Sequence, residues 1–208
     1  MLKRLIVFTA LAVSSAAVAH ADSISGFFSA FGSDSFTSST LTFVPGSSTV
    51  QPGIGGTFAS YLTQGNPINF LGGALPYSPG AQTTPGGIPI QFFTTSEAGE
   101  TFAFFLTSYN ASYVPSTGSV TGCTSGNTCL LITGNGFFTG TGAVAYDATP
   151  AVFQFDSSYV PGQAIGTVTS FAAQASAIPP AIPEPATLAL FGTGLVGLVG
   201  VARRRFNV

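Results

Sequence analysis

Two pairs of carboxylates in the middle of the chain are the side chains best suited to acid–base chemistry. Glu97 and Glu100 occupy one hydrophilic turn, and Asp147 and Asp156 flank a short apolar run. Two suitably spaced carboxyl groups are all that a glycoside hydrolase needs, and carboxylates joined by backbone carbonyls are ligands for calcium. Because solvated surface acids are commoner than either kind of site, we interpret all four as surface charge. The sequence therefore predicts no catalytic residue, no metal site and no cofactor.

Basic residues are absent from the whole middle of the chain. Lys3, Arg4 and the arginines at 203–205 are the only cations, and His20 is the only histidine. Residues 22–182 hold six carboxylates and no base, a formal charge of 0 − 6 = −6. Without cations there is no counterion release from a nucleic acid, and without histidine no Ser-His-Asp or Cys-His arrangement can form. We expect no nucleic-acid partner and no enzymatic activity.

Cys123 and Cys129 are the only cysteines, and the run between them, Ser125-Gly126-Asn127, has turn-forming composition. An even number of closely spaced cysteines in an exported chain is typical of a disulfide. A redox-active pair would instead have CxxC spacing and electropositive surroundings, and this pair has neither. The sequence predicts a structural disulfide that closes a hairpin.

Aromatic and threonine side chains raise two alternatives that involve binding. Aromatic rings stack on sugars, so a carbohydrate-binding module is the alternative to a structural role, although a buried tyrosine with its hydroxyl at the edge is the commoner arrangement. The tyrosine candidates are Tyr61, Tyr77, Tyr109, Tyr113 and Tyr159. Thr-x-Thr runs of the kind that an ice-binding face needs also occur, but they recur at no fixed interval. Ice binding is therefore a weaker alternative.

The elements that must position these residues are short β-strands separated by Gly/Pro turns. The predicted strands are 35–44, 57–62, 88–95, 101–109, 128–133, 136–141, 143–146, 151–156 and 167–174. This pattern predicts an all-β fold, a single β-sandwich over residues 22–175 of which the jelly roll is one form. Residues 71–87, which include Tyr77, are rich in Gly and Pro and predict a long surface loop. Residues 176–182 predict a stiff Pro-rich stalk.

The N-terminal segment has the features of a secretory signal peptide. A positive start, Lys3-Arg4, precedes fourteen apolar residues, and Ala19-His20-Ala21 supplies the small residues that signal peptidase needs. We expect cleavage after Ala21, with Ala17-Val18-Ala19 as the alternative site, so that residues 1–21 are removed and the chain is exported.

The C-terminal segment, residues 183–208, combines three features in a fixed order. Pro183-Glu184-Pro185 holds the chain extended, and residues 186–202 form an uncharged run at the short end of a bilayer span. Arg203-Arg204-Arg205 then follow and place the end of the run on the cytoplasmic side. Four glycines weaken the run as a helix. The pattern predicts a transmembrane helix at 186–202 that serves as a temporary anchor.

This arrangement resembles the PEP-CTERM sorting signal of bacterial envelope proteins. The resemblance rests on Pro183, Glu184, Pro185, the apolar run and Arg203 to Arg205, and covers only the C-terminal end of the chain. It implies that exosortase, a membrane processing enzyme, is a partner that removes the tail. The chain would then sit in the inner membrane only transiently and pass to the cell surface or the extracellular matrix.

Together these features predict an exported, non-catalytic envelope or matrix protein. The resemblance implies a structural or adhesive role, with exopolysaccharide or a biofilm as the setting. A carbohydrate-binding module is the alternative, and a glycoside hydrolase or an ice-binding protein fits the residues less well.

Overall fold

The computed structural model describes residues 22–115, 123–180 and 193–194, and strands make up most of them. The strands are β1 (Asp22–Ser23), β2 (Gly26–Phe36), β3 (Thr40–Phe43), β4 (Ser48–Val50), β5 (Pro67–Phe70), β6 (Leu75–Pro76), β7 (Gly80–Thr83), β8 (Ile90–Glu97), β9 (Glu100–Val114), β10 (Thr128–Gly142), β11 (Tyr146–Asp147), β12 (Thr149–Tyr159) and β13 (Thr169–Ala177). The two short 3-10 helices are η1 (Gly56–Ser60) and η2 (Pro85–Gly87).

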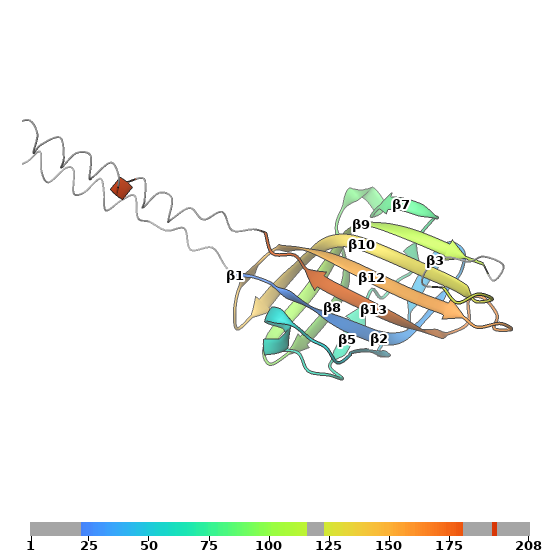
Figure 1. The fold of residues 1–208 in the computed structure, drawn as a ribbon, viewed down its shortest axis with the longest axis horizontal. Coiled ribbons are helices and arrows are strands. Elements are labelled where there is room, and N and C mark those ends of the chain that lie inside the picture. The colour runs from blue at the N-terminus through green and yellow to red at the C-terminus, as the bar shows by residue number, and fades with distance from the viewer. Residues whose placement is uncertain (1–21, 116–122, 181–192, 195–208) are drawn as a thin grey trace, which may run out of the picture.

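Eight antiparallel strands close into a barrel, in the order β2-β13-β12-β10-β9-β8-β5-β4 and back to β2 (Figure 1). The closing contact joins the first long strand to the last, from Gly26 opposite Ala177 to Asp34 opposite Thr169. The predicted β-sandwich is therefore wrong. Alternating inward and outward residues mark one buried face in a sandwich and in a barrel alike, so strand periodicity could not show that the sheet edges pair.

The interior of the barrel is filled with aromatic side chains. Twelve phenylalanines are buried, from Phe28 to Phe171, and they make a continuous set of edge-to-face and stacked contacts. Small residues on β13, Ala173, Ala175 and Ala177, face the same core and leave room for the rings. An eight-stranded barrel has an interior just wide enough for side chains to fill, so the core is packed and the molecule has a solid centre.

Two strands were predicted poorly because each contains a glycine against which a neighbouring strand or side chain packs closely. In β2, a Cβ on Gly32 would lie 2.4 Å from Ser48 Oγ and 2.8 Å from the ring of Phe171. In β10, a Cβ on Gly136 would lie 1.9 Å from the carbonyl oxygen of Phe105, beside a register shift in the β9–β10 pairing. Interior glycines often mark such bulges. The predicted strands 128–133 and 136–141 are thus one bulged strand. Most of β2 was missed, because the predicted strand 35–44 covers only its last two residues and then β3.

One predicted strand is a helix, and the predicted loop contains strands. Residues 57–62 mostly fall in η1, where buried Phe58 stacks edge-on against Phe28 and Phe102. Gly56 has a φ of 63°, and a Cβ there would lie 2.4 Å from the carbonyl oxygen of Ser25, so the chain bends where a strand was expected. Within 71–87, β6 pairs with β3 and β7 pairs with β9.

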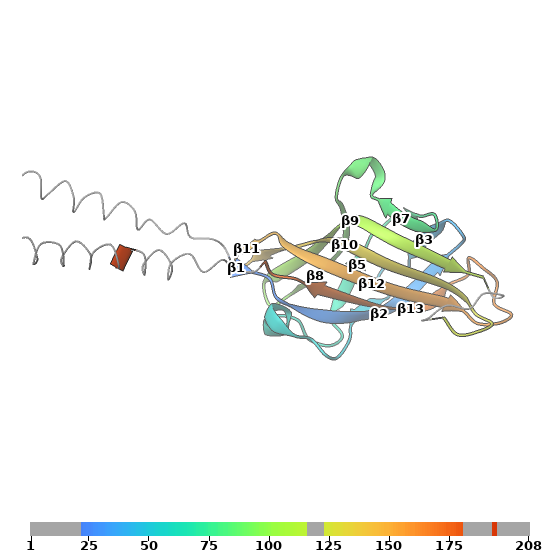
Figure 2. The same cartoon turned by 45° about the horizontal axis from the view of Figure 1, so that its top comes forward.

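β1 and the C-terminal end of β13 lie at the same end of the barrel, as Figures 1 and 2 show. At that end β1 pairs with β11, and the N–H of Ile178 donates to the carbonyl of Pro150 just after β13. β13 runs to Ala177, two residues into the segment predicted as a stalk. The turn that joins β12 to β13 lies at the opposite end of the barrel, away from β1.

The predicted terminal segments are mostly beyond the structure's description. Residues 1–21 lie outside the described residues, as does the predicted membrane helix 186–202 apart from residues 193–194, which are helical. Among the described residues no helix has the length and apolar character needed to cross a bilayer. The predicted transmembrane helix is therefore not shown by the structure.

Candidate functional site

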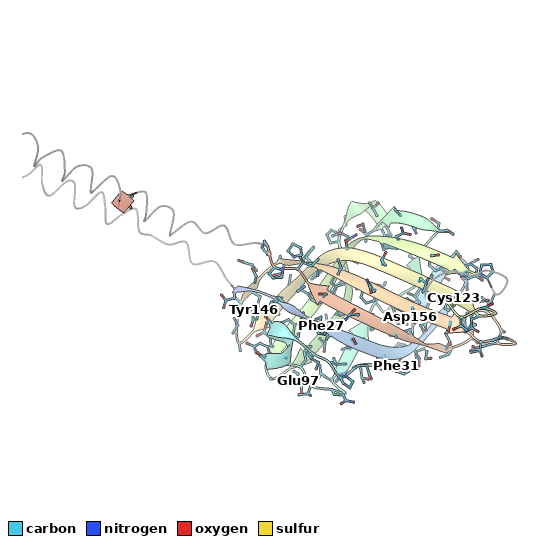
Figure 3. The ribbon with its side chains drawn as sticks, in the orientation of Figure 1. Phe27, Phe31, Glu97, Cys123, Tyr146 and Asp156 are labelled. Carbon is cyan, nitrogen blue, oxygen red and sulfur yellow. A yellow bond between two sulfur atoms is a disulfide. The ribbon has the colours of Figure 1, made fainter. Side chains whose placement is uncertain are left out.

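The predicted disulfide is confirmed. Cys123 and Cys129 are bonded, with their Cα atoms 5.9 Å apart. Cys129 lies at the start of β10, opposite Val114 of β9 and Ser158 of β12. The bond therefore ties residue 123 to the start of β10, at the end of the barrel opposite Tyr146 (Figure 3).

Asp147 and Asp156 are not brought together. Asp147 lies in β11 at the end where the chain enters the barrel, and Asp156 lies on the outer face of β12 (Figure 3). Desolvation by its neighbours raises the pKa of Asp156. In the described segments no three acidic, histidine or cysteine side chains gather as metal ligands would. The pair therefore forms neither a catalytic dyad nor a calcium site here.

Glu97 and Glu100 face each other across the β8–β9 hairpin, but their surroundings differ. Glu97 accepts hydrogen bonds from both the N–H and the hydroxyl of Thr63, each at 2.6 Å. Glu100 is only 1 % exposed, so the interpretation of both acids as solvated surface charge is wrong for this one. The residue is drawn inward because it continues the buried face of β9 that includes Phe102.

Glu100 lies in a close-fitting space at the rim of the barrel. Its Oε2 accepts the N–H of Val144 at 3.1 Å, whereas its Oε1 has no partner among the described residues. Gly140 and Gly142 leave room for it, since a Cβ at either would lie 3.4 Å or less from a carboxyl oxygen. The ring of Tyr146 also packs over Gly140, so the carboxyl group is covered from outside.

Tyr146 completes this rim cluster. Its hydroxyl donates to the hydroxyl of Tyr61 at 3.2 Å. Desolvation, this hydrogen bond and the nearby carboxylates raise the pKa of Tyr146 to about 12. A phenol with so high a pKa stays protonated at neutral pH and cannot serve as a general base there.

Asp34 is a buried acid that sequence reasoning missed. It is fully buried on β2, where Ser157 Oγ donates to its Oδ1 at 2.8 Å and its Oδ2 has no partner in the described chain. Burial raises its pKa to about 7, although the hydrogen bond from Ser157 acts in the opposite direction. The available signal was the alternation of β2, in which Phe28, Asp34 and Phe36 share the inward face.

The hydroxyl of Tyr159 forms hydrogen bonds with both β2 and the β12–β13 turn. Its hydroxyl accepts the N–H groups of Phe36 at 2.8 Å and Gly166 at 3.0 Å. The same hydroxyl lies within donating distance of the carbonyls of Phe36 (2.8 Å) and Thr167 (3.0 Å). The tyrosine ties β12, β2 and the β12–β13 turn together, so it is not free to bind a sugar.

The tyrosine of greatest interest for sugar binding is also in the core. Tyr77 is 4 % exposed and donates its hydroxyl to the carbonyl of Thr37. Tyr109 is equally buried and donates to the carbonyl of Pro76 at 2.5 Å. Burial raises the pKa of both. Tyr61 and Tyr113 are partly buried against the same core, so none of the five tyrosine candidates presents an open ring.

The interior of the barrel beside β2 and β13 has no room for a ligand. A recess between β2 and β13, lined by Phe28, Phe153 and Ala175 among others, is too small to admit a water molecule. A ligand therefore cannot occupy this recess.

Comparison with known proteins adds information at the C-terminus. The PEP-CTERM protein-sorting motif matches residues 181–205. This chain carries a PEP-CTERM sorting signal. The signal indicates an exported protein that exosortase, a membrane enzyme, processes and sorts to the surface. The residues that carry it, Pro183 to Pro185 and Arg203 to Arg205, lie outside the described residues. No curated protein and no solved structure matches this chain.

Proposed function

We propose that this PEP-CTERM protein has a structural or adhesive role without catalytic turnover, within exopolysaccharide or a biofilm matrix. Export and sorting by exosortase follow from the motif at 181–205. The matrix role goes further, and its main support is that aromatic side chains fill the interior of the described barrel, so that the side chains able to meet a partner lie on its outer surface. On this proposal the protein acts through its surface after the tail has been removed.

The positions of the acids support the non-catalytic part of the proposal. A glycoside hydrolase needs two carboxyl groups that reach the same bond, roughly 5 to 10 Å apart. Asp34 is hydrogen-bonded to Ser157, which lies opposite Leu130 near the start of β10. Glu100 lies opposite Gly142, at the other end of β10. Twelve residues of strand, roughly 40 Å, lie between these levels. The nearer pair, Glu97 and Glu100, includes one carboxyl that is covered by its neighbours.

The sorting part is tested by changing Pro183-Glu184-Pro185 to Ala-Ala-Ala in the producing cell. We expect the tail to insert as before and processing to stop, so that the protein keeps its full size and stays in the membrane fraction. Replacing Pro179 and Pro180 with alanine is the matched control, because these prolines precede the matched region. Normal size and normal surface delivery of the Ala-Ala-Ala variant would contradict the proposal.

The absence of turnover is tested with a panel of polysaccharides and chromogenic glycosides. We expect no product above background from the parent chain at pH 4 to 9. Glu100→Gln is the informative variant, because the amide keeps the shape of the side chain while removing its charge and acidity. Hydrolysis by the parent that this variant loses, with unchanged thermal unfolding, would make the protein a glycoside hydrolase.

A further inference from the structure

The outer face of five neighbouring strands carries a continuous row of uncharged hydrogen-bonding side chains. The strands are β2, β13, β12, β10 and β9, and the row consists of Ser29, Gln174, Gln154, Thr133 and Asn110. Each of the five stands directly opposite the next in the sheet register. With strands about 4.8 Å apart, the row extends for roughly 19 Å across the barrel wall. We call it the amide row.

The side chains of the amide row are available to a partner. Four of the five are exposed and Ser29 is half-buried. None of them makes a side-chain hydrogen bond to another residue that the structure describes, whereas most buried hydroxyls of the barrel, such as those of Ser157 and Tyr159, are fully engaged. Amide and hydroxyl groups both donate and accept. The row can therefore match hydroxyl groups, which also do both.

Two exposed aromatic rings flank the amide row at one end. Phe27 and Phe31 are 42 % and 49 % exposed and stand two residues either side of Ser29 on β2 (Figure 3). Their positions are about 13 Å apart along the strand. The ring of Phe27 is held against Gly55, where a Cβ would lie only 2.9 Å away. Exposed aromatic rings offer an apolar surface with a negative face, which suits the C–H face of a sugar ring.

The charge of the face restricts the class of partner. Next to the amide row, Phe31, Ala172, Asp156, Leu131 and Ser112 form one bordering row, and Phe27, Ser176, Val152, Asn135 and Ser108 form the other. Asp156 is the one ionisable group in the three rows. Residues 22–180 contain no Lys, Arg or His, so a polyanion meets repulsion with no compensating attraction. A neutral partner avoids this cost.

We propose that this face binds an extended neutral polysaccharide, with Phe27 and Phe31 stacking on sugar rings and the amide row bonding to hydroxyl groups. The proposal rests on the matrix role proposed above and names its ligand and its site. The three rows lie along the outer wall of the barrel, so they fit the side of a polysaccharide chain or fibre better than an enclosed sugar. A second copy of this chain is the other occupant of such a face, but it would bury ten or more polar groups that need partners.

The test is depletion of the purified full chain, kept in detergent, from suspensions of insoluble neutral polysaccharides. Microcrystalline cellulose, chitin and β-1,3-glucan particles are the probes, and alginate beads provide the polyanion. We expect binding to at least one neutral particle and none to alginate. Phe27→Ala with Phe31→Ala, and separately Gln154→Ala with Gln174→Ala, should each weaken binding about tenfold or more, since each pair removes two contacts.

Matched controls separate this face from general stickiness. Ile165→Ala removes an exposed large apolar side chain, at 54 % exposure, from the β12–β13 turn, outside the three rows. Gln163→Ala removes a glutamine from the β12–β13 turn. Both should bind as the parent does, and all variants should share its unfolding temperature.

Three outcomes would overturn the proposal. They are no binding of the parent to any neutral particle, equal binding by the face variants, and a change of molecular mass in solution on Phe27→Ala with Phe31→Ala while binding is kept. The last would make the face a contact between copies. Any of these results leaves sorting and the lack of turnover untouched, because those are measured by processed size and by product release.

Discussion

At the scale of single residues, Asp34 is the group whose chemistry the fold changes most. Its carboxyl is fully buried, bonded only to Ser157 among the described side chains, and its pKa is raised from 3.8 to about 7. The native state therefore holds a proton that the unfolded state loses between these pH values. The free energy of unfolding is highest below about pH 4, falls as the pH rises towards 7, and levels off above it.

Asp34→Asn should remove this fall. A native pKa of about 7 in place of the ordinary 3.8 corresponds to a loss of stability on the order of 4 kcal/mol between acid and neutral pH. The asparagine amide carries no charge at either pH, so the variant should be more stable than the parent at pH 8 by an amount up to that loss. Urea unfolding from pH 4 to 8 measures both profiles. Asp147→Asn, at an exposed carboxylate, is the control, and parallel profiles for parent and Asp34→Asn would contradict the prediction.

At the scale of elements, the long pairing of β9 with β10 depends on the bulge beside Gly136. The register shifts between Asn135 and Gly136, and the backbone of Phe105 approaches Gly136 so closely that a Cβ would lie 1.9 Å from its carbonyl oxygen. Because the obstacle is backbone in a central strand, it cannot rotate away as a side chain would. The glycine is thus required by the sheet geometry and not by a turn.

Gly136→Ala should lower the free energy of unfolding by on the order of 2 to 4 kcal/mol, since relief of the overlap must separate β9 from β10. Urea unfolding at constant pH measures the change. Gly72→Ala is the matched control, because a Cβ at Gly72 meets nothing within 4 Å, and it should change the value by less than about 0.5 kcal/mol. Equal effects of the two substitutions would show that the close approach is absent.

At the scale of the whole molecule, the separation of charge along the sequence has a direct consequence. Every Lys and Arg lies at 3–4 or 203–205. The described body therefore has no Lys or Arg with which its carboxylates could pair, and its stability comes from the aromatic core and the closed sheet. Trypsin has no site anywhere between Arg4 and Arg203.

We expect trypsin to leave residues 5–203 in one piece even after reduction and denaturation in urea. Mass spectrometry of the digest gives the result directly. Chymotrypsin is the control, because twenty phenylalanines and six tyrosines give it many sites once the chain is unfolded. A tryptic fragment of the full chain that begins or ends inside residues 5–203 would contradict the prediction.

Several features were determined by the sequence alone because they depend on residues that are close together along the chain. The sorting signal is one continuous segment, the disulfide joins cysteines six positions apart, and strand alternation correctly located most of β8, β9, β12 and β13. The absence of cations from the body needs only a reading of the composition. None of these conclusions depends on how distant segments meet.

Only the tertiary structure decided the closure of the barrel and the fate of the acids. β2 meets β13 across more than 130 residues, and no local pattern specifies which sheet edges pair. That pairing puts Asp34 beside Ser157. In the same way, Val144 and Tyr146 come from a distant part of the chain and cover Glu100. It also aligns Ser29 with Gln174 and Gln154 on the outer wall. Burial and register are properties of contacts between distant segments, so these sites exist only in the folded chain.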